Sequence, residues 1–213
     1  MARALGDEHF APPIIASETA FKGALWSVVR ERFEYGGHEL VREYVDHPGA
    51  VAVLAIDDQE RVLLIRQYRH PIRMRELELP AGLLDIDGES ALTAAQRELA
   101  EEVDLEAAKW SLLTEFFTSP GSNSESIRVY LARGLRATAA FDRTGEEADL
   151  ELYWVGLDDA VEAVLERRIG NVIASVSLLA AQALRNRGWE GLGDADAPWP
   201  QHPKLRDARY VKQ

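Results

Sequence analysis

The sequence has 213 residues, a formal net charge of −12 and 46% hydrophobic residues. This length and composition fit one domain with a real core, or a core domain with an appendage. A chain this acidic is repelled by a nucleic-acid backbone and by an anionic membrane, so we expect neither as a partner. It contains no cysteine, which excludes disulfides and thiolate sites and fits a reducing cytoplasm.

The beginning of the sequence lacks the apolar core of a signal peptide. The most apolar later run, residues 172–184, contains polar residues and is too short to span a bilayer. We therefore expect a cytoplasmic protein.

The N-terminal part is predicted to form its own antiparallel unit, residues 1–46. Residues 1–20 have no clear period and include two consecutive prolines, so they predict an extended arm. Residues 25–35 and 39–45 predict two strands joined by a glycine turn.

Most of the remaining chain alternates between strand and helix patterns. Residues 49–56 and 61–68 are short apolar runs typical of buried strands, and residues 91–103 have helical spacing. The other expected elements are strands at 76–79, 110–117, 126–134 and 150–155, helices at 157–168 and 172–187, a glycine-rich loop at 82–88, and a charged loop at 143–149. This order predicts a mixed α/β or α+β layer structure.

Three glutamates on the predicted helix indicate a metal site. Glu98, Glu101 and Glu102 share one helix face, whereas Leu99 and Val103 fall on another. Clustered carboxylates repel one another and give no stability by themselves. Mg²⁺ turns that repulsion into binding because it prefers oxygen ligands. Alone, such a cluster is more often a solvated acidic helix face, and only the flanking residues favour the metal site.

The residues around the glutamates resemble the Nudix box. The pattern is Gly, five residues, Glu, seven residues, Arg-Glu, an aliphatic residue, any residue, Glu-Glu, any residue, Gly, aliphatic. The matching positions are Gly82, Glu89, Arg97, Glu98, Leu99, Glu101, Glu102 and Leu105.

Two positions depart from the family pattern. Six residues, not five, separate Gly82 from Glu89, and a loop absorbs such an insertion. Asp104 replaces the final glycine, which we expect to end the helix in a left-handed conformation. Asp tolerates that region at a cost of about 1 kcal/mol. Its charge is also unfavourable at a helix C-terminus.

The resemblance implies a loop–helix–loop that binds Mg²⁺, or Mn²⁺, and hydrolyses a diphosphate linked to another group. The implied metal ligands are the carboxylates of Glu98, Glu101 and Glu102 and the carbonyl of Ala81. Arg97 is expected to orient these carboxylates, with a plain helix-surface ion pair as the alternative. Glu89 is expected to be an outer ligand, and Gly82 a structural position of the box.

The loop at residues 119–125 supplies a candidate general base. It resembles the loop of ADP-ribose pyrophosphatases in which Pro-Gly, three variable residues and Glu bring a carboxylate to the metals. Glu125 is the carboxylate here, and Gly121 permits the tight turn. Without the box, Glu125 would be interpreted as a solvated residue before a strand.

The resemblance to ADP-ribose pyrophosphatases extends over residues 25–187. Residues 62–71 and 76–82 are similar to the strand pair before the box, and residues 160–184 to two C-terminal helices. It implies a Nudix α/β/α sandwich with a mixed sheet at residues 47–187, followed by a polar tail at 188–213. The implied reaction is hydrolysis of ADP-ribose to AMP and ribose 5-phosphate.

Members of this group are homodimers in which N-terminal strands pack across the partner. Residues 1–46 fit that arrangement. Arg69, Arg75 and Glu78 are candidate substrate contacts, and a surface or strand-edge role is the alternative for each. Trp26 or Tyr35 is a candidate for stacking on adenine, against an ordinary core or dimer-contact role.

Two other functions stay open. The box recognises only the diphosphate, so another nucleoside diphosphate sugar is an alternative substrate. A catalytically silent Nudix module that binds a nucleotide is the second alternative, although every box carboxylate is present.

Overall fold

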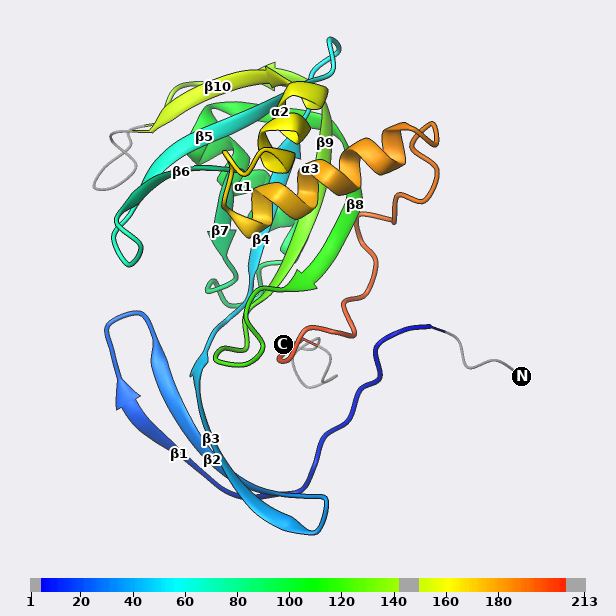
Figure 1. Ribbon diagram of the computed structural model, residues 1–213. Helices are drawn as coiled ribbons and strands as arrows, with labels where there is room; N and C mark the ends of the chain where they lie inside the picture. Colours follow the sequence, from blue (N-terminus) through cyan, green and yellow to red (C-terminus); the bar gives the residue numbers. More distant parts are fainter. Residues whose placement is uncertain (1–4, 142–149, 206–213) are drawn as a thin grey trace. The chain divides into compact units, whose positions relative to one another are not determined.

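A computed structural model describes residues 5–141 and 150–205, so the predicted charged loop at 143–149 and the end of the tail lie outside the described residues (Figure 1). The chain forms two compact units. Among the described residues, the first unit comprises 5–48, 119–125 and 199–205, and the second comprises 49–118, 126–141 and 150–198.

The first unit contains an antiparallel sheet of order β1-β2-β3. Its strands are β1 (Ile14–Lys22), β2 (Ser27–Tyr35) and β3 (His38–Asp46). Gly36 and Gly37 both have positive φ, at 59° and 77°, which a two-residue hairpin turn requires. The arm predicted for residues 1–20 is therefore in part a strand. All nine residues of β1 are exposed, so no burial pattern marks it in the sequence.

The second unit contains a mixed four-stranded sheet and an antiparallel three-stranded sheet (Figure 1). The first has the order β7-β4-β9-β8, with β4 and β9 parallel, and the second has the order β10-β5-β6. The strands are β4 (Ala50–Ala55), β5 (Arg61–Arg69), β6 (Met74–Glu78), β7 (Ala81–Leu83), β8 (Leu105–Phe117), β9 (Ser126–Ala137) and β10 (Glu151–Gly156).

Helices cover both faces of β4, which explains its continuous apolar sequence. Val51 and Val53 face one core with residues of α1 (Ala91–Val103). Ala52 and Leu54 face the other core with residues of α2 (Leu157–Leu165) and α3 (Val172–Arg185), which lie together in Figure 1. This arrangement confirms the predicted α/β/α sandwich with a mixed sheet and an N-terminal antiparallel unit.

Element boundaries differ from the prediction mainly at exposed ends. Helix α1 has the predicted bounds, but β8 begins at Leu105 instead of residue 110. Helix α2 ends at Leu165, and Arg167 then adopts a φ of +65° that a helix cannot contain. The predicted loop at 82–88 begins inside the short strand β7.

Described residues of the polar tail contact strands β8 and β9. The buried guanidinium of Arg128 donates to the carbonyls of Ala197 (2.8 Å) and Pro198 (3.1 Å) and pairs with Glu115. A bridge joins Leu112 to Gly193. Among the described residues, no helix is long and apolar enough to cross a membrane.

Candidate active site

Helix α1 begins and ends at residues suited to those positions. Ser90 is the N-cap, and its hydroxyl accepts a hydrogen bond from the N–H of Thr93 at 3.1 Å. Asp104 ends the helix at φ 55° and ψ 39°, the left-handed conformation expected for the box glycine. The Asp104 carboxylate also accepts from the N–H of Phe141 at 2.8 Å, a contact that glycine could not make.

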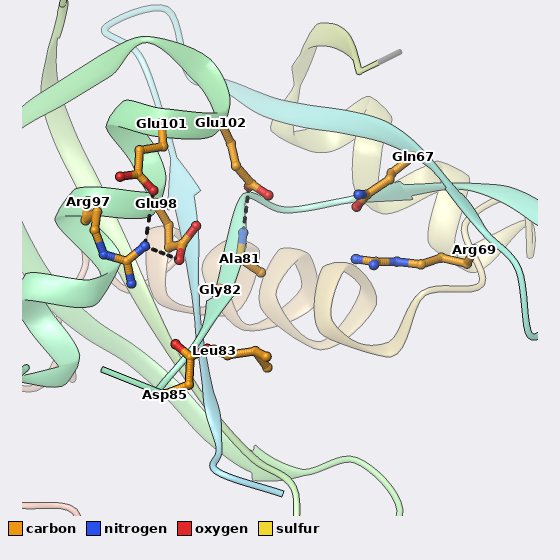
Figure 2. Close-up of a pocket in the computed structure, with 10 residues that line it drawn as sticks. All are labelled: Gln67, Arg69, Ala81, Gly82, Leu83, Asp85, Arg97, Glu98, Glu101 and Glu102. Atoms are coloured by element: carbon orange, nitrogen blue, oxygen red, sulfur yellow. Dashed lines mark hydrogen bonds and ion pairs between the residues drawn. The ribbon is translucent and has the colours of Figure 1, made fainter. Parts of the chain in front are cut away.

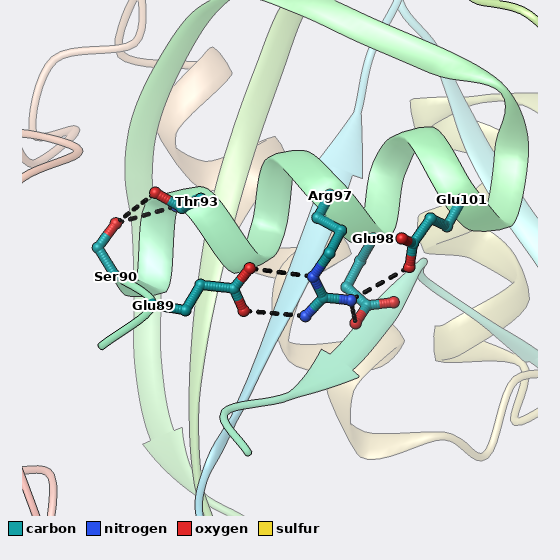
Figure 3. A network of polar contacts seen from close by, with 6 residues as sticks. All are labelled: Glu89, Ser90, Thr93, Arg97, Glu98 and Glu101. Atoms are coloured by element: carbon teal, nitrogen blue, oxygen red, sulfur yellow. Dashed lines mark hydrogen bonds and ion pairs between the residues drawn. The ribbon is translucent and has the colours of Figure 1, made fainter. Parts of the chain in front are cut away.

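Arg97 joins three of the box carboxylates (Figure 3). Its Nε and Nη2 donate to the two oxygens of Glu89 at 3.0 and 2.9 Å. Its Nη1 donates to Glu98 at 2.6 Å and to Glu101 at 3.2 Å. The hydrogen bonds to Glu89, followed by those to Glu98, raise the pKa of the guanidinium well above its ordinary value. Since Glu89 and Glu98 are largely buried, this pairing offsets the cost of removing their charges from water.

The third box glutamate on this helix, Glu102, contacts the backbone of β7 (Figure 2). It is only 6% exposed, and its carboxylate accepts from the N–H of Ala81 at 2.9 Å. Two hydrogen bonds on either side of Ala81 mark hydrogen-bonded pairs between β4 and β7. The N–H of Val53 donates to the carbonyl of Pro80, and the N–H of Leu84 donates to the carbonyl of Gly49. Ala81 lies between these pairs, so its N–H and carbonyl both point away from β4, on the free edge of the sheet.

Gly82 leaves the space that Glu98 occupies. A Cβ built at residue 82 would overlap the carboxyl and the Cγ of Glu98. The box glycine is therefore required here by close packing against a glutamate side chain.

These residues line an open cleft of about 460 Å³ in the second unit (Figure 2). Its lining consists of Gln67, Arg69, Ala81, Gly82, Leu83, Asp85, Arg97, Glu98, Glu101 and Glu102. Arg69 makes two hydrogen bonds to the buried carboxylate of Glu78, at 2.8 and 2.7 Å. Gln67 and Asp85 are lining residues that were not predicted from the sequence. Gln67 is 7% exposed in an otherwise apolar run, and a buried polar residue in such a run is a usable signal.

The donor set of this cleft fits a hard divalent cation. Glu98, Glu101 and Glu102 supply carboxylate oxygens, and Ala81 supplies a carbonyl on the free strand edge. Within the two described ranges, no three acidic or histidine side chains already form a metal-binding group. Glu98 and Glu101 instead bind Arg97, and Glu102 binds an N–H. These partners therefore hold the three carboxylates at the cleft.

Two predicted substrate contacts, Arg75 and Glu78, are not among the residues that line the cleft, and the predicted stacking residues Trp26 and Tyr35 belong to the first unit. Arg75 pairs with Glu151 at 3.2 Å. Trp26 stacks on His47 with ring centroids 4.5 Å apart, and Tyr35 contacts the edge of Phe10.

The predicted base, Glu125, belongs to the first unit. Its carboxylate lies 3.3 Å from Nε2 of His47, and its N–H donates to the side chain of Asn123 at 2.9 Å. A role for His47 was not predicted from the sequence.

Comparison with known proteins identifies the class. Residues 46–176 match the model of the NUDIX domain. The sequence is 41% identical over 200 residues to an ADP-ribose pyrophosphatase of Mycobacterium tuberculosis, covering 93% of this chain and 96% of that one. It is 37% identical over 156 residues to an ADP-ribose pyrophosphatase of Bacillus subtilis, covering 73% and 84%.

A solved structure described as an ADP compounds hydrolase has the same fold, with a TM-score of 0.71 and 24% identity. That alignment covers 86% of this chain and all of the other. Together with the carboxylate helix, these matches define a Nudix-fold diphosphohydrolase. This chain belongs to the Nudix hydrolase family.

Proposed function

We propose that this protein hydrolyses the diphosphate of ADP-ribose to AMP and ribose 5-phosphate, with Mg²⁺ or Mn²⁺ as cofactor. The arrangement of Glu98, Glu101, Glu102 and Gly82 around one cleft supports the metal-dependent diphosphate chemistry. The choice of ADP-ribose rests on the two pyrophosphatases at 41% and 37% identity.

Each site residue has a proposed role. The proposed metal ligands are Glu98, Glu101, Glu102 and the carbonyl of Ala81, and a cation bound there would offset the charge of the diphosphate. Arg97, held by Glu89, orients the carboxylates before the metal binds. Glu125 is the proposed general base that removes a proton from the attacking water.

Substrate contacts are proposed for Arg69, Arg75 and Glu78. Arg69 is the best supported, because it lines the cleft and its two hydrogen bonds to Glu78 fix its guanidinium. Glu78 then acts by orienting Arg69.

A homodimer built with the N-terminal sheet is also proposed. Every residue of β1 is exposed, including Ile14, Ile15 and Phe21. Sedimentation of the full chain gives its mass in solution, and a monomer would contradict the proposal.

The deciding experiment is product analysis with ADP-ribose and Mg²⁺. Glu98→Gln and Glu102→Gln should each lower kcat by about 10²-fold or more, and Glu125→Gln by a similar factor through loss of a general base. Glu106→Gln, at an exposed carboxylate on β8, is the matched control. A panel of nucleoside diphosphate sugars tests the substrate, and a nucleotide hexose ranking well above ADP-ribose would reject it.

A further inference from the structure

The loop that carries Glu125 is fixed to the end of strand β3. The N–H of Val45 donates to the carbonyl of Ser122 at 3.0 Å, and the N–H of Ser124 donates to the carbonyl of Val45 at 3.1 Å. Two residues further along, the N–H of His47 donates to Oγ of Ser124 at 2.9 Å. These three bonds determine the backbone position of the loop, whereas the orientation of the Glu125 carboxylate depends on its side-chain contacts.

The side chain of His47 meets that carboxylate from the strand side. It is 8% exposed and stacks on the indole of Trp26, with an angle of 20° between the ring planes. The stack fixes the plane of the imidazole and directs Nε2 toward Glu125, whose Oε1 lies at 3.3 Å. The side chain of Glu125 is 23% exposed, so part of it stays accessible.

The imidazole is suited to hold a base without neutralising it. Burial lowers the pKa of His47, and the nearby charges of Glu125, Lys204 and Asp46 modify this effect. The ring is therefore neutral near pH 7, and its Nε2–H is close enough to donate to the carboxylate. A neutral donor orients a carboxylate, whereas a lysine or arginine in its place would stabilise the charged form and weaken the base.

We propose that His47 is a positioning residue for Glu125. Its ring, fixed by Trp26, donates from Nε2 to one carboxylate oxygen and so selects the orientation in which the other oxygen accepts a proton. The inference rests on the proposed function, in which Glu125 is the general base.

Three variants separate the donor from the ring. His47→Phe keeps an aromatic ring on Trp26 but removes the donor, and it should lower kcat by about 10-fold to 100-fold, as expected for a misplaced catalytic group. The KM for ADP-ribose should change by less than about twofold, because binding is unaffected. His47→Gln returns an N–H at the place of Nε2 and should recover most of the activity. His38→Phe, on the exposed start of β3, is the matched control.

A double-mutant cycle tests whether His47 acts through Glu125. In a Glu125→Gln background, His47→Phe should have no further effect on kcat, because the two residues act as one unit. An equal loss in both backgrounds would overturn the inference, as would a His47→Gln variant that folds normally but is as slow as His47→Phe. Circular dichroism and Tm confirm folding for every variant.

Failure of the proposed function can be distinguished from failure of the inference about His47. If wild type does not hydrolyse ADP-ribose, the same series is run on the best substrate of the diphosphate panel. Titration of His47 by NMR then completes the test, because this measurement needs no substrate. Glu125→Gln should lower the pKa of His47, since the carboxylate favours the protonated ring. An unchanged pKa would overturn the contact on which the inference depends.

Discussion

The carboxyl group of Glu98 lies against Gly82, in the space that any larger residue would fill with its Cβ. This contact links the loop before the helix to the first glutamate of the metal face. It also explains why the box requires glycine at a position whose backbone conformation does not demand one.

Gly82→Ala should displace Glu98 and impair the metal site. Because an error of about 1 Å in a catalytic group costs about 10²-fold, we expect kcat/KM to fall by that factor. The Mg²⁺ concentration for half-maximal rate should rise as well. Gly170→Ala, where a Cβ meets only ordinary contacts, is the control. A Gly82→Ala enzyme with normal activity would show that Glu98 binds metal in another rotamer.

Arg97→Lys should show that the planar fork of arginine is needed. One ammonium cannot bridge both oxygens of Glu89 and also reach Glu98 and Glu101. Loss of such an orienting partner typically costs about 10-fold to 100-fold in metal affinity or activity. Metal titration of the rate measures this loss. Arg136→Lys, in an exposed pair with Glu106, should change the unfolding free energy by less than about 0.5 kcal/mol.

Asp104 combines a strained conformation with a useful side chain. Asp104→Ala keeps the left-handed strain and loses the acceptor for the N–H of Phe141, so unfolding should require about 1–2 kcal/mol less. Asp104→Asn keeps an acceptor and removes a charge from the helix C-terminus, so it should match wild type within about 0.5 kcal/mol. Urea unfolding compares them. Equal stability of both variants would mean that the bond to Phe141 contributes nothing.

The bounds predicted for α1 agree with the structure because they depend on local signals. Apolar residues repeat at helical spacing, and a residue tolerant of positive φ follows the helix. The same periodicity predicts that Glu98, Glu101 and Glu102 share a face. It does not predict that Glu102 turns inward, because that depends on Ala81 and the register of β7 against β4.

The features that the sequence did not predict depend on pairings between residues far apart in the chain. Strand β1 carries no burial pattern, so only its partner β2 defines it. The neighbour of Glu125 is the least predictable feature of the site. His47 follows a strand in a different part of the sequence, and an isolated histidine there has no recognisable motif.

His47 also predicts a specific dependence of stability on pH. Burial lowers its pKa in the folded chain, so the unfolded chain takes up a proton first as the pH falls. The stability of the neutral, buried ring is present above the unfolded pKa of about 6.5 and is lost as the pH falls through the folded pKa. The His47→Phe variant has no imidazole here and therefore lacks this pH-dependent contribution to stability. The unfolding free energy of wild type relative to His47→Phe should therefore decrease between about pH 7.5 and pH 5.

Urea unfolding at a series of pH values measures that difference directly. Tyr35→Phe, on the same hairpin, removes no histidine and should run parallel to wild type across the range. Glu125, Asp46 and Lys204 face His47 and remain in both chains, so their own titration largely cancels in the comparison. A difference that grows as the pH falls would mean that the ring is stabilised in its charged form, with Glu125 outweighing burial.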